Sequence, residues 1–132
     1  MDPALRPDAA LVDRFAQDFG ELTEPGDRVG IAVSGGPDSV ALLLLAAAVR
    51  PDGIEAATID HRLRPESAGE ARFVAGLCQR LGVPHVTLAV EVPRGASVQA
   101  QARHARYRAL TDWAIEQSLE AVSYTHLTLP TN

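Results

Sequence analysis

The chain has 132 residues, of which 46% are apolar, and this is enough to bury one hydrophobic core, so we expect one domain or part of one. The longest apolar run, residues 40–49, is too short to cross a bilayer, and the acidic start lacks the positive region of a secretory signal. These features exclude a membrane span and predict a cytoplasmic protein. The net charge of −5 is uneven: residues 1–60 carry eleven acidic residues and four arginines, whereas residues 61–132 carry six and eight. Any contact with nucleic acid is therefore expected in the second half.

All cationic residues are arginines, because the chain contains no lysine. A Walker-type phosphate loop uses a lysine to reach the β and γ phosphates of a nucleotide, so this class of nucleotide binder is excluded. The single cysteine, Cys78, falls in a helical pattern and has no second cysteine with which to form a disulfide. We therefore expect a packed core thiol and predict neither redox nor zinc chemistry.

The hydrophobic pattern predicts helices that alternate with strands. In chain order, the expected elements are a helix over residues 8–20, a strand over 28–33, a helix over 38–49, a strand over 54–59, a helix over 66–81, a strand over 85–90 and a helix over 97–118. Strands that alternate with helices of this length imply right-handed crossovers. The expected fold class is therefore α/β, with a parallel sheet and helices on both faces, and ligands are expected at the carboxyl ends of the strands.

Two adjacent glycines separate the first expected strand from the helix that follows it, in the segment Ser34–Ser39. Bare backbone amides in such a turn can face an anion, the start of the helix adds a positive dipole, and the two serines supply hydroxyl donors. A tight turn alone would not require serines on both sides and an Asp-Ser pair at the helix start. Asp38 also fits a second role, as a cap for the free amides of the helix. The segment is therefore predicted to bind phosphate.

The same segment, Ser-Gly-Gly-Pro-Asp-Ser, resembles the pyrophosphate loop of the N-type ATP pyrophosphatases, the PP-loop superfamily. The resemblance implies a Rossmann-like fold of the adenine nucleotide alpha hydrolase type, and cleavage of ATP between its α and β phosphates. It also implies ATP and Mg²⁺ as cofactors, with Asp38 as a catalytic residue that helps to organise the metal. The ATP-binding residues implied here are Ser34, Gly35, Gly36, Pro37, Asp38 and Ser39.

Two further segments are similar to the lysidine synthetases of this superfamily. The first, Ile59–Ser67, matches Val-Asp-His-Gly-Leu-Arg-Pro-Glu-Ser except at Ile59 and Arg62. Asp60 and His61 follow a strand and are expected to bind ATP, although a solvated loop with a Pro-Glu-Ser helix start is the alternative. By the same resemblance, Arg64 is expected to contact phosphate or tRNA.

The second segment, Ser97–Tyr107, is similar to the Gln-Ala-x-Ala-Arg-x-x-Arg-Tyr helix of the same family. Arg103 is the expected catalytic cation, stabilising charge on ATP or on the adenylated base. Arg106 is expected to contact phosphates of ATP or tRNA. A solvated basic face on an amphipathic helix is the alternative for both arginines.

The family resemblance implies that the full-length enzyme adenylates the wobble cytidine of tRNA(Ile) with ATP, after which L-lysine displaces AMP to form lysidine. The products are AMP and pyrophosphate, and tRNA(Ile) and L-lysine are the implied partners. The oligomeric state stays open, with a homodimer among the options. The alternatives are a tRNA thiolase of the same superfamily, which typically uses cysteine pairs, and a non-catalytic nucleotide-binding module of the universal stress type.

The pattern changes after Val122. Residues 123–132 carry no acidic or basic charge, show no helix or strand periodicity and do not match the family, and a fourth strand is expected only at Ala121 and Val122. We therefore expect residues 1–122 to form a partial PP-loop domain, with a sheet that is incomplete at its carboxyl end. Residues 123–132 are expected to be a tail foreign to the family, with an artefactual origin left open. A chain of this kind is expected to retain ATP binding at most.

Overall fold

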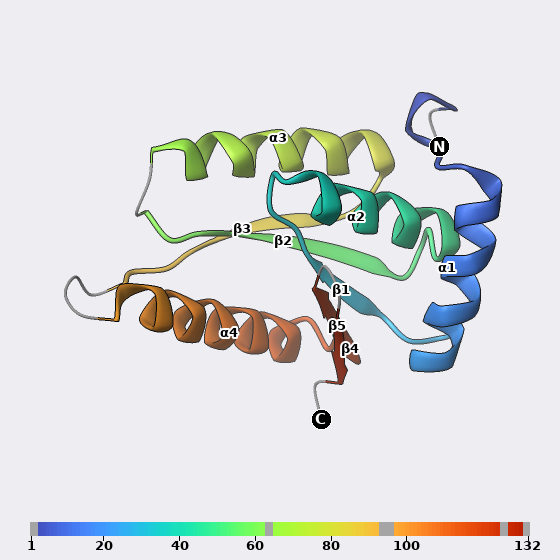
Figure 1. Ribbon diagram of the computed structural model, residues 1–132. Helices are drawn as coiled ribbons and strands as arrows, with labels where there is room; N and C mark the ends of the chain where they lie inside the picture. The colour runs from blue at the N-terminus through green and yellow to red at the C-terminus, as the bar shows by residue number, and fades with distance from the viewer. Residues whose placement is uncertain (1–2, 63–64, 93–96, 125–126, 131–132) are drawn as a thin grey trace.

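The computed structural model describes residues 3–62, 65–92, 97–124 and 127–130, which form helices that alternate with strands (Figure 1). The elements are η1 (Pro3–Leu5), α1 (Ala9–Leu22), β1 (Val29–Ala32), α2 (Pro37–Val49), β2 (Ile54–Asp60), α3 (Glu66–Leu81), β3 (His85–Ala89), α4 (Val98–Glu116), β4 (Ala121–Tyr124) and β5 (Leu127–Pro130). Each helix and strand expected up to residue 118 is present, with bounds within two residues of the expected ones. The alternating pattern was therefore sufficient to place the elements.

The strands form one sheet in the order β3-β2-β1-β4-β5, in which the first four are parallel. The central strand is β1, where Val29 is in register with Ile54 of β2 on one side and with Ala121 of β4 on the other. The chain builds the sheet outward from β1 to β3 and then returns to the opposite side of β1. The strand order thus reverses between β1 and β4, and the carboxyl ends of strands at such a reversal are where α/β sheets bind ligands.

Helices cover both faces of the sheet, as expected (Figure 1). α2 and α3 lie on one face, where a core cluster includes Leu43 and Val74, both with no exposed surface. α4 lies on the other face, where Leu110 and Trp113 pack in a second cluster. α2 is apolar all round because its outer side is covered by α1. The expected fold class, a parallel α/β sheet covered on both faces, is confirmed.

Local signals in the sequence fix several helix ends. The Asp8 carboxylate accepts a hydrogen bond from the amide of Ala10 at 2.8 Å and caps α1. α3 ends at Gly82, whose φ of 72° lies in the left-handed region that glycine adopts without strain. Among the residues described by the structure, no helix is both long enough and apolar enough to cross a membrane.

The sheet ends in two short strands of four residues each, which agrees with the expected incomplete sheet. The expectation that no strand continues past Val122 is wrong. β4 continues through Ser123 and Tyr124, and Ser123 is in register with Ile31 of β1. Residues 127–130 form β5, antiparallel to β4. Main-chain hydrogen bonds to a neighbouring strand form whatever the side-chain periodicity, so an irregular polar sequence did not prevent pairing here.

Candidate functional site

The turn between β1 and α2 lies at the carboxyl edge of the sheet, where the strand order reverses. The amide of Val33 donates to the carbonyl of Ala57 at 2.9 Å and keeps the chain aligned with β2 just before the turn. Gly36 is the N-cap residue of α2, with φ −75° and ψ 157°, and no side chain caps the helix. Proline at the first helical position has no amide to satisfy.

The start of α2 therefore presents uncapped amides and a positive dipole end at the edge of the sheet, which is the local chemistry of an anion site. Asp38 stands at the second helical position and does not act as the N-cap, so the capping role considered for it is wrong. Its carboxylate is exposed. Asp38 is thus available to contact a ligand or a hydrated metal ion beside the turn.

The two serines of the turn have different roles in the structure. Ser39 is 3% exposed, and its hydroxyl oxygen accepts a hydrogen bond from the amide of Ser34 at 2.8 Å. The same hydroxyl lies 3.4 Å from the carbonyl of Ala32, to which it donates. Ser34 is exposed, and its hydroxyl accepts a longer hydrogen bond, 3.3 Å, from the amide of Gly36. Ser39 therefore holds the turn from inside, whereas Ser34 faces solvent.

The two glycines also differ. A β-carbon placed on Gly35 would lie 3.0 Å from Cγ and 3.1 Å from Cβ of Glu70, a residue of α3. A β-carbon placed on Gly36 would meet only the hydroxyl of Ser34, at an ordinary 3.5 Å. Neither glycine has a positive φ. The protein itself therefore leaves no room for a side chain at Gly35, whereas at Gly36 it leaves room.

Asp60 is the last residue of β2 and His61 follows it, so both lie at the same edge of the sheet as the turn, because β1 and β2 are parallel neighbours. The Asp60 carboxylate accepts a hydrogen bond from the amide of Arg62 at 3.0 Å, and its carbonyl accepts one from Val90 at 2.9 Å. Arg62 has a left-handed φ of 58°, so Asp60 stabilises a turn that a non-glycine residue adopts at some cost. His61 is half-buried. The structure thus places both residues at the expected edge and gives Asp60 a structural role.

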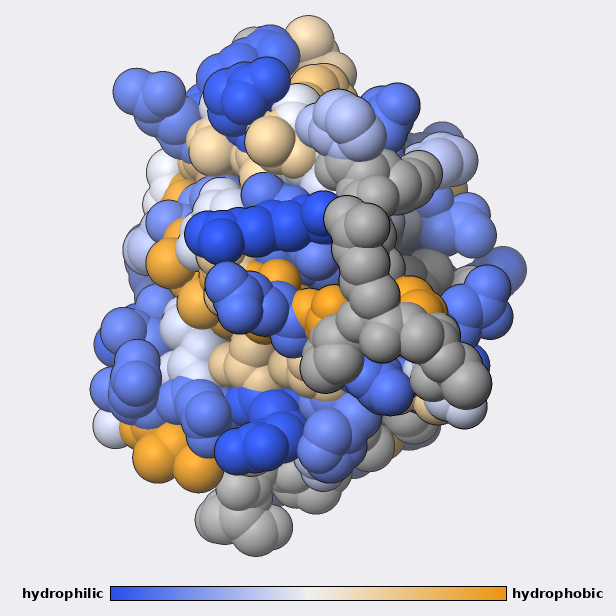
Figure 2. All heavy atoms as spheres, turned by 90° about the vertical axis from the view of Figure 1, so that its left-hand side faces the viewer, coloured by the Kyte–Doolittle hydropathy of each residue, from blue (hydrophilic) through white to orange (hydrophobic). Residues whose placement is uncertain are grey.

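The arginines predicted for catalysis and phosphate contact lie on α4. Arg103 and Arg106 are exposed there, on the face of the sheet opposite α2. Arg103 is in the first third of α4, and this end of the helix lies at the carboxyl edge because α4 leads from β3 back to β4. Figure 2 looks onto the side where α3 and α4 begin, and hydrophilic side chains gather there around small apolar patches. Arg64 falls outside the described residues.

The sequence reasoning missed Glu70. This residue is half-buried on α3 and shares one helix face with the core residues Val74 and Leu77. An acidic residue in line with two core positions is the signal that would have identified it. Ser67, one turn earlier, is 3% exposed, and its hydroxyl has no hydrogen-bond partner among the described residues.

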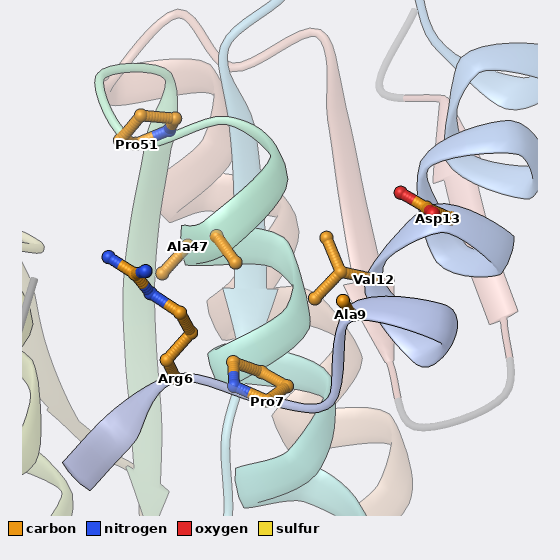
Figure 3. A pocket seen from close by; sticks show the side chains of 8 residues that line it. Arg6, Pro7, Ala9, Val12, Asp13, Ala47 and Pro51 are labelled. Carbon is orange, nitrogen blue, oxygen red and sulfur yellow. The ribbon is translucent and has the colours of Figure 1, made fainter. Parts of the chain in front are cut away.

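A separate hollow of about 420 Å³ lies between α1 and α2 (Figure 3). Its lining comes from the segment before α1, from α1 and from the end of α2, and consists of Arg6, Pro7, Ala9, Val12, Asp13, Ala47, Ala48 and Pro51. The end of α2 lies at the amino edge of the parallel strands, away from the turn at Ser34–Ser39. The hollow is therefore not part of the candidate site.

Comparison with solved structures agrees with this fold. The chain superposes on the tRNA thiolase NcsA from Methanococcus maripaludis with a TM-score of 0.71 and 12% identity, over 89% of this chain and 45% of that one. It superposes on the NH₃-dependent NAD synthetase from Campylobacter jejuni with a TM-score of 0.65 and 17% identity, over 88% and 56%. At such identities the likeness shows a shared fold.

Sequence comparison is more specific. The chain is 50% identical over 118 residues to a tRNA(Ile)-lysidine synthase from Novosphingobium aromaticivorans, covering 89% of this chain and 36% of that protein. It is 49% identical over 109 residues to the corresponding protein from Zymomonas mobilis, covering 81% and 33%. The chain therefore spans about a third of the length of the curated relatives it matches.

The family model of the PP-loop domain matches residues 8–128, a range that contains the uncapped turn at the start of α2. The family match thus includes this turn, which lies at the carboxyl edge of a parallel sheet. The chain belongs to the PP-loop domain family.

Proposed function

We propose that the turn at Ser34–Ser39 binds the β and γ phosphates of ATP. The observation that carries this proposal is the uncapped start of α2, preceded by two glycines and fixed from inside by the hydrogen bond from the Ser34 amide to Ser39. Amides that the protein itself does not satisfy are donors for phosphate oxygens, and the helix dipole favours their negative charge. Family membership supports ATP as the nucleotide.

Mg²⁺ is the metal that we propose to accompany ATP. Within the described residues, no group of three or more histidine, cysteine, aspartate or glutamate side chains could hold a metal ion alone. This fits Mg²⁺, which usually keeps several waters and binds through one or two carboxylates together with substrate phosphates. The exposed carboxylate of Asp38, in the first turn of α2, is the proposed protein ligand. When bound, the metal neutralises charge on the departing pyrophosphate.

For the whole enzyme we propose ATP-dependent formation of lysidine in tRNA(Ile), with L-lysine as the second substrate. Support comes from the relatives named tRNA(Ile)-lysidine synthase at 50% and 49% identity. The cytidine oxygen would attack the α phosphorus, the bond to the bridging oxygen would break, and pyrophosphate would leave. Lysine would then displace AMP from the activated base. The loop amides would hold the leaving group throughout the first step.

Arg103 is the proposed catalytic cation of this reaction, and Arg106 a contact to phosphate of ATP or tRNA. Both arginines are exposed on α4, and Arg103 lies towards the carboxyl edge of the sheet, which supports these roles. A guanidinium presents a positive charge and a planar set of N–H donors, so it can stabilise the negative charge that develops as adenylation proceeds. Asp60 and His61 are proposed to line the nucleotide site beside β2.

A tRNA thiolase shares the fold, but Cys78 does not support that reaction. Cys78 is the single cysteine of the chain and has no exposed surface, and burial raises its pKa to about 11. A sulfur-transfer nucleophile must be an accessible thiolate, and this thiol is neither accessible nor ionised near neutral pH. Cys78 therefore gives no support for a thiolase, whereas the relatives named tRNA(Ile)-lysidine synthase support lysine as the proposed nucleophile.

A chimeric enzyme tests the proposed function. Residues 8–122 of this chain would replace the matching segment of the Novosphingobium aromaticivorans relative, and AMP release would be followed with tRNA(Ile), with and without lysine. We expect lysine-dependent AMP release, reduced about 100-fold in the graft by Asp38→Asn, because the loss of this carboxylate would weaken the hold on the Mg²⁺ that neutralises the departing pyrophosphate. AMP release that requires a sulfur donor and ignores lysine would contradict the proposal.

A further inference from the structure

The phosphate loop contacts a residue of α3 that family membership does not assign. The Glu70 side chain packs against Gly35 through its methylene groups, which would lie 3.0 and 3.1 Å from a β-carbon at Gly35. The carboxylate carbon of Glu70 would be 3.6 Å from the same point. A β-carbon so close to another side chain forces one of the two groups to move. Glu70 therefore occupies the space into which any side chain at position 35 would project.

Glu70 is well placed to fix the loop, because its helix is anchored in the core. Val74 and Leu77, on the same face of α3, are 0% and 8% exposed. α3 in turn packs on β2 and β3. The loop is thus held from two sides, by the Ser39 hydroxyl within its own chain segment and by the Glu70 stem from α3. Two consecutive glycines otherwise leave a loop with high conformational freedom.

We propose that Glu70 is a positioning residue for the phosphate loop, acting through the contact of its methylene stem with Gly35. The inference rests on the proposed function of the loop as a pyrophosphate site. A loop held in its binding conformation loses less conformational entropy when the ligand binds, so its affinity is higher. The same contact accounts for glycine at position 35, where φ is not positive and strain does not require glycine.

The stem and the carboxylate of Glu70 can be separated by substitution. Glu70→Gln keeps the methylene groups and removes the charge, whereas Glu70→Ala removes the γ-methylene group and the carboxylate and leaves only the β-carbon. Glu66→Ala is the matched control, because Glu66 is an exposed acidic residue of the same helix. Dissociation constants for inorganic pyrophosphate and ATP, each with Mg²⁺, would be measured by calorimetry on the chain and its variants. Urea unfolding of each variant would confirm that it is folded at the temperature of the binding measurement.

We expect Glu70→Ala to weaken pyrophosphate binding about three- to tenfold, the cost of ordering a loop residue that is no longer held. Glu70→Gln and Glu66→Ala should stay within about twofold of the unaltered chain. Equal affinity of Glu70→Ala and the unaltered chain would overturn the inference. So would an equal loss in Glu70→Gln, which would assign the effect to charge.

A double substitution tests the contact itself. Gly35→Ala should weaken pyrophosphate binding in the unaltered background, because the new methyl group meets the Glu70 stem. In the Glu70→Ala background the same substitution should have a smaller effect, since the contact with Cγ at 3.0 Å is gone and only the contact with Cβ at 3.1 Å remains. An undiminished effect would overturn the inference. Failure of the unaltered chain to bind either ligand would instead overturn the proposed function, and the inference with it.

Discussion

The hydroxyl oxygen of Ser39 accepts a hydrogen bond from the amide of Ser34 at 2.8 Å, across the turn that joins β1 to α2. Ser39 is buried in the first turn of α2, and its hydroxyl also donates to Ala32 at the end of β1. One side chain therefore connects the strand, the turn and the helix. The amides at the start of α2 have no side-chain cap because the N-cap residue is Gly36, which has no side chain.

Ser39→Ala should destabilise the protein by about 1–3 kcal/mol, because the Ser34 amide then loses its partner in a part-buried position. The free energy of unfolding would be measured by urea titration. Ser34→Ala is the matched control: Ser34 is exposed and accepts only a 3.3 Å hydrogen bond, so its loss should change the free energy of unfolding by less than about 0.5 kcal/mol. Equal effects of the two substitutions would contradict the role of Ser39.

Gly36→Ala should separate binding from stability. A methyl group there meets only the Ser34 hydroxyl at 3.5 Å, so the free energy of unfolding should change by less than about 0.5 kcal/mol. Binding of ATP should weaken about tenfold or more, because the methyl group lies where a phosphate must approach the backbone. Unfolding and calorimetry would be run on the same samples. Unchanged affinity would show that phosphate does not approach Gly36.

Gly30→Ala should be strongly destabilising, because Gly30 of β1 lies against the Trp113 ring. A β-carbon there would come within 2.7 Å of the indole and 2.8 Å of Leu119, so α4 must shift on the sheet. Overpacking of this kind costs about 1–3 kcal/mol of unfolding free energy. Gly76→Ala in α3 is the control, because no atom lies within 4 Å and the substitution should stabilise the helix by about 0.5–1 kcal/mol. Thermal unfolding that ranks the two variants the other way would contradict the packing of α4.

His85 should make stability depend on pH. Burial lowers the pKa of its imidazole below the usual 6.5, and Nε2 lies 2.9 Å from the hydroxyl of Thr58. The unfolded chain takes up the proton at a higher pH than the folded chain, so protonation of His85 favours unfolding. The contribution of neutral His85 to the free energy of unfolding is therefore complete above pH 6.5 and is lost as the pH falls from 6.5 towards the folded pKa. Urea unfolding at several pH values should therefore show that the free energy of unfolding of the unaltered chain falls, relative to that of His85→Gln, as the pH is lowered below 6.5. A rise relative to His85→Gln would contradict the direction of the shift.

The sequence was sufficient to place the elements and the glycine turn between β1 and α2, because both depend on local patterns. Apolar periodicity and glycine positions placed the strands and helices up to α4, and the segment Ser34–Ser39 named the loop directly. The family was predicted from three segments and is confirmed by the match over residues 8–128. The roles of Asp38, Arg103 and Arg106 stay predictions, as does the domain boundary after Val122, a position that β4 crosses.

Contacts between residues that are far apart in the sequence could not be predicted from it. Glu70 meets Gly35 only because α3 and the β1–α2 turn come together in three dimensions. Arg28 pairs with the buried Glu55 for the same reason, since β1 and β2 are neighbours. The continuation of β4 past Val122 and the strand β5 were missed, because their pairing depends on backbone hydrogen bonds with adjacent strands and not on a side-chain pattern.

The most direct test of the account is competition for ATP. A fluorescent ATP analogue bound to the chain in the presence of Mg²⁺ would be titrated with pyrophosphate and, separately, with AMP. If the turn at Ser34–Ser39 holds the β and γ phosphates, pyrophosphate should displace the analogue at least about tenfold more effectively than AMP, because it retains the groups that the uncapped amides bind. Displacement by AMP that equals or exceeds displacement by pyrophosphate would contradict the claim that this loop is a pyrophosphate site.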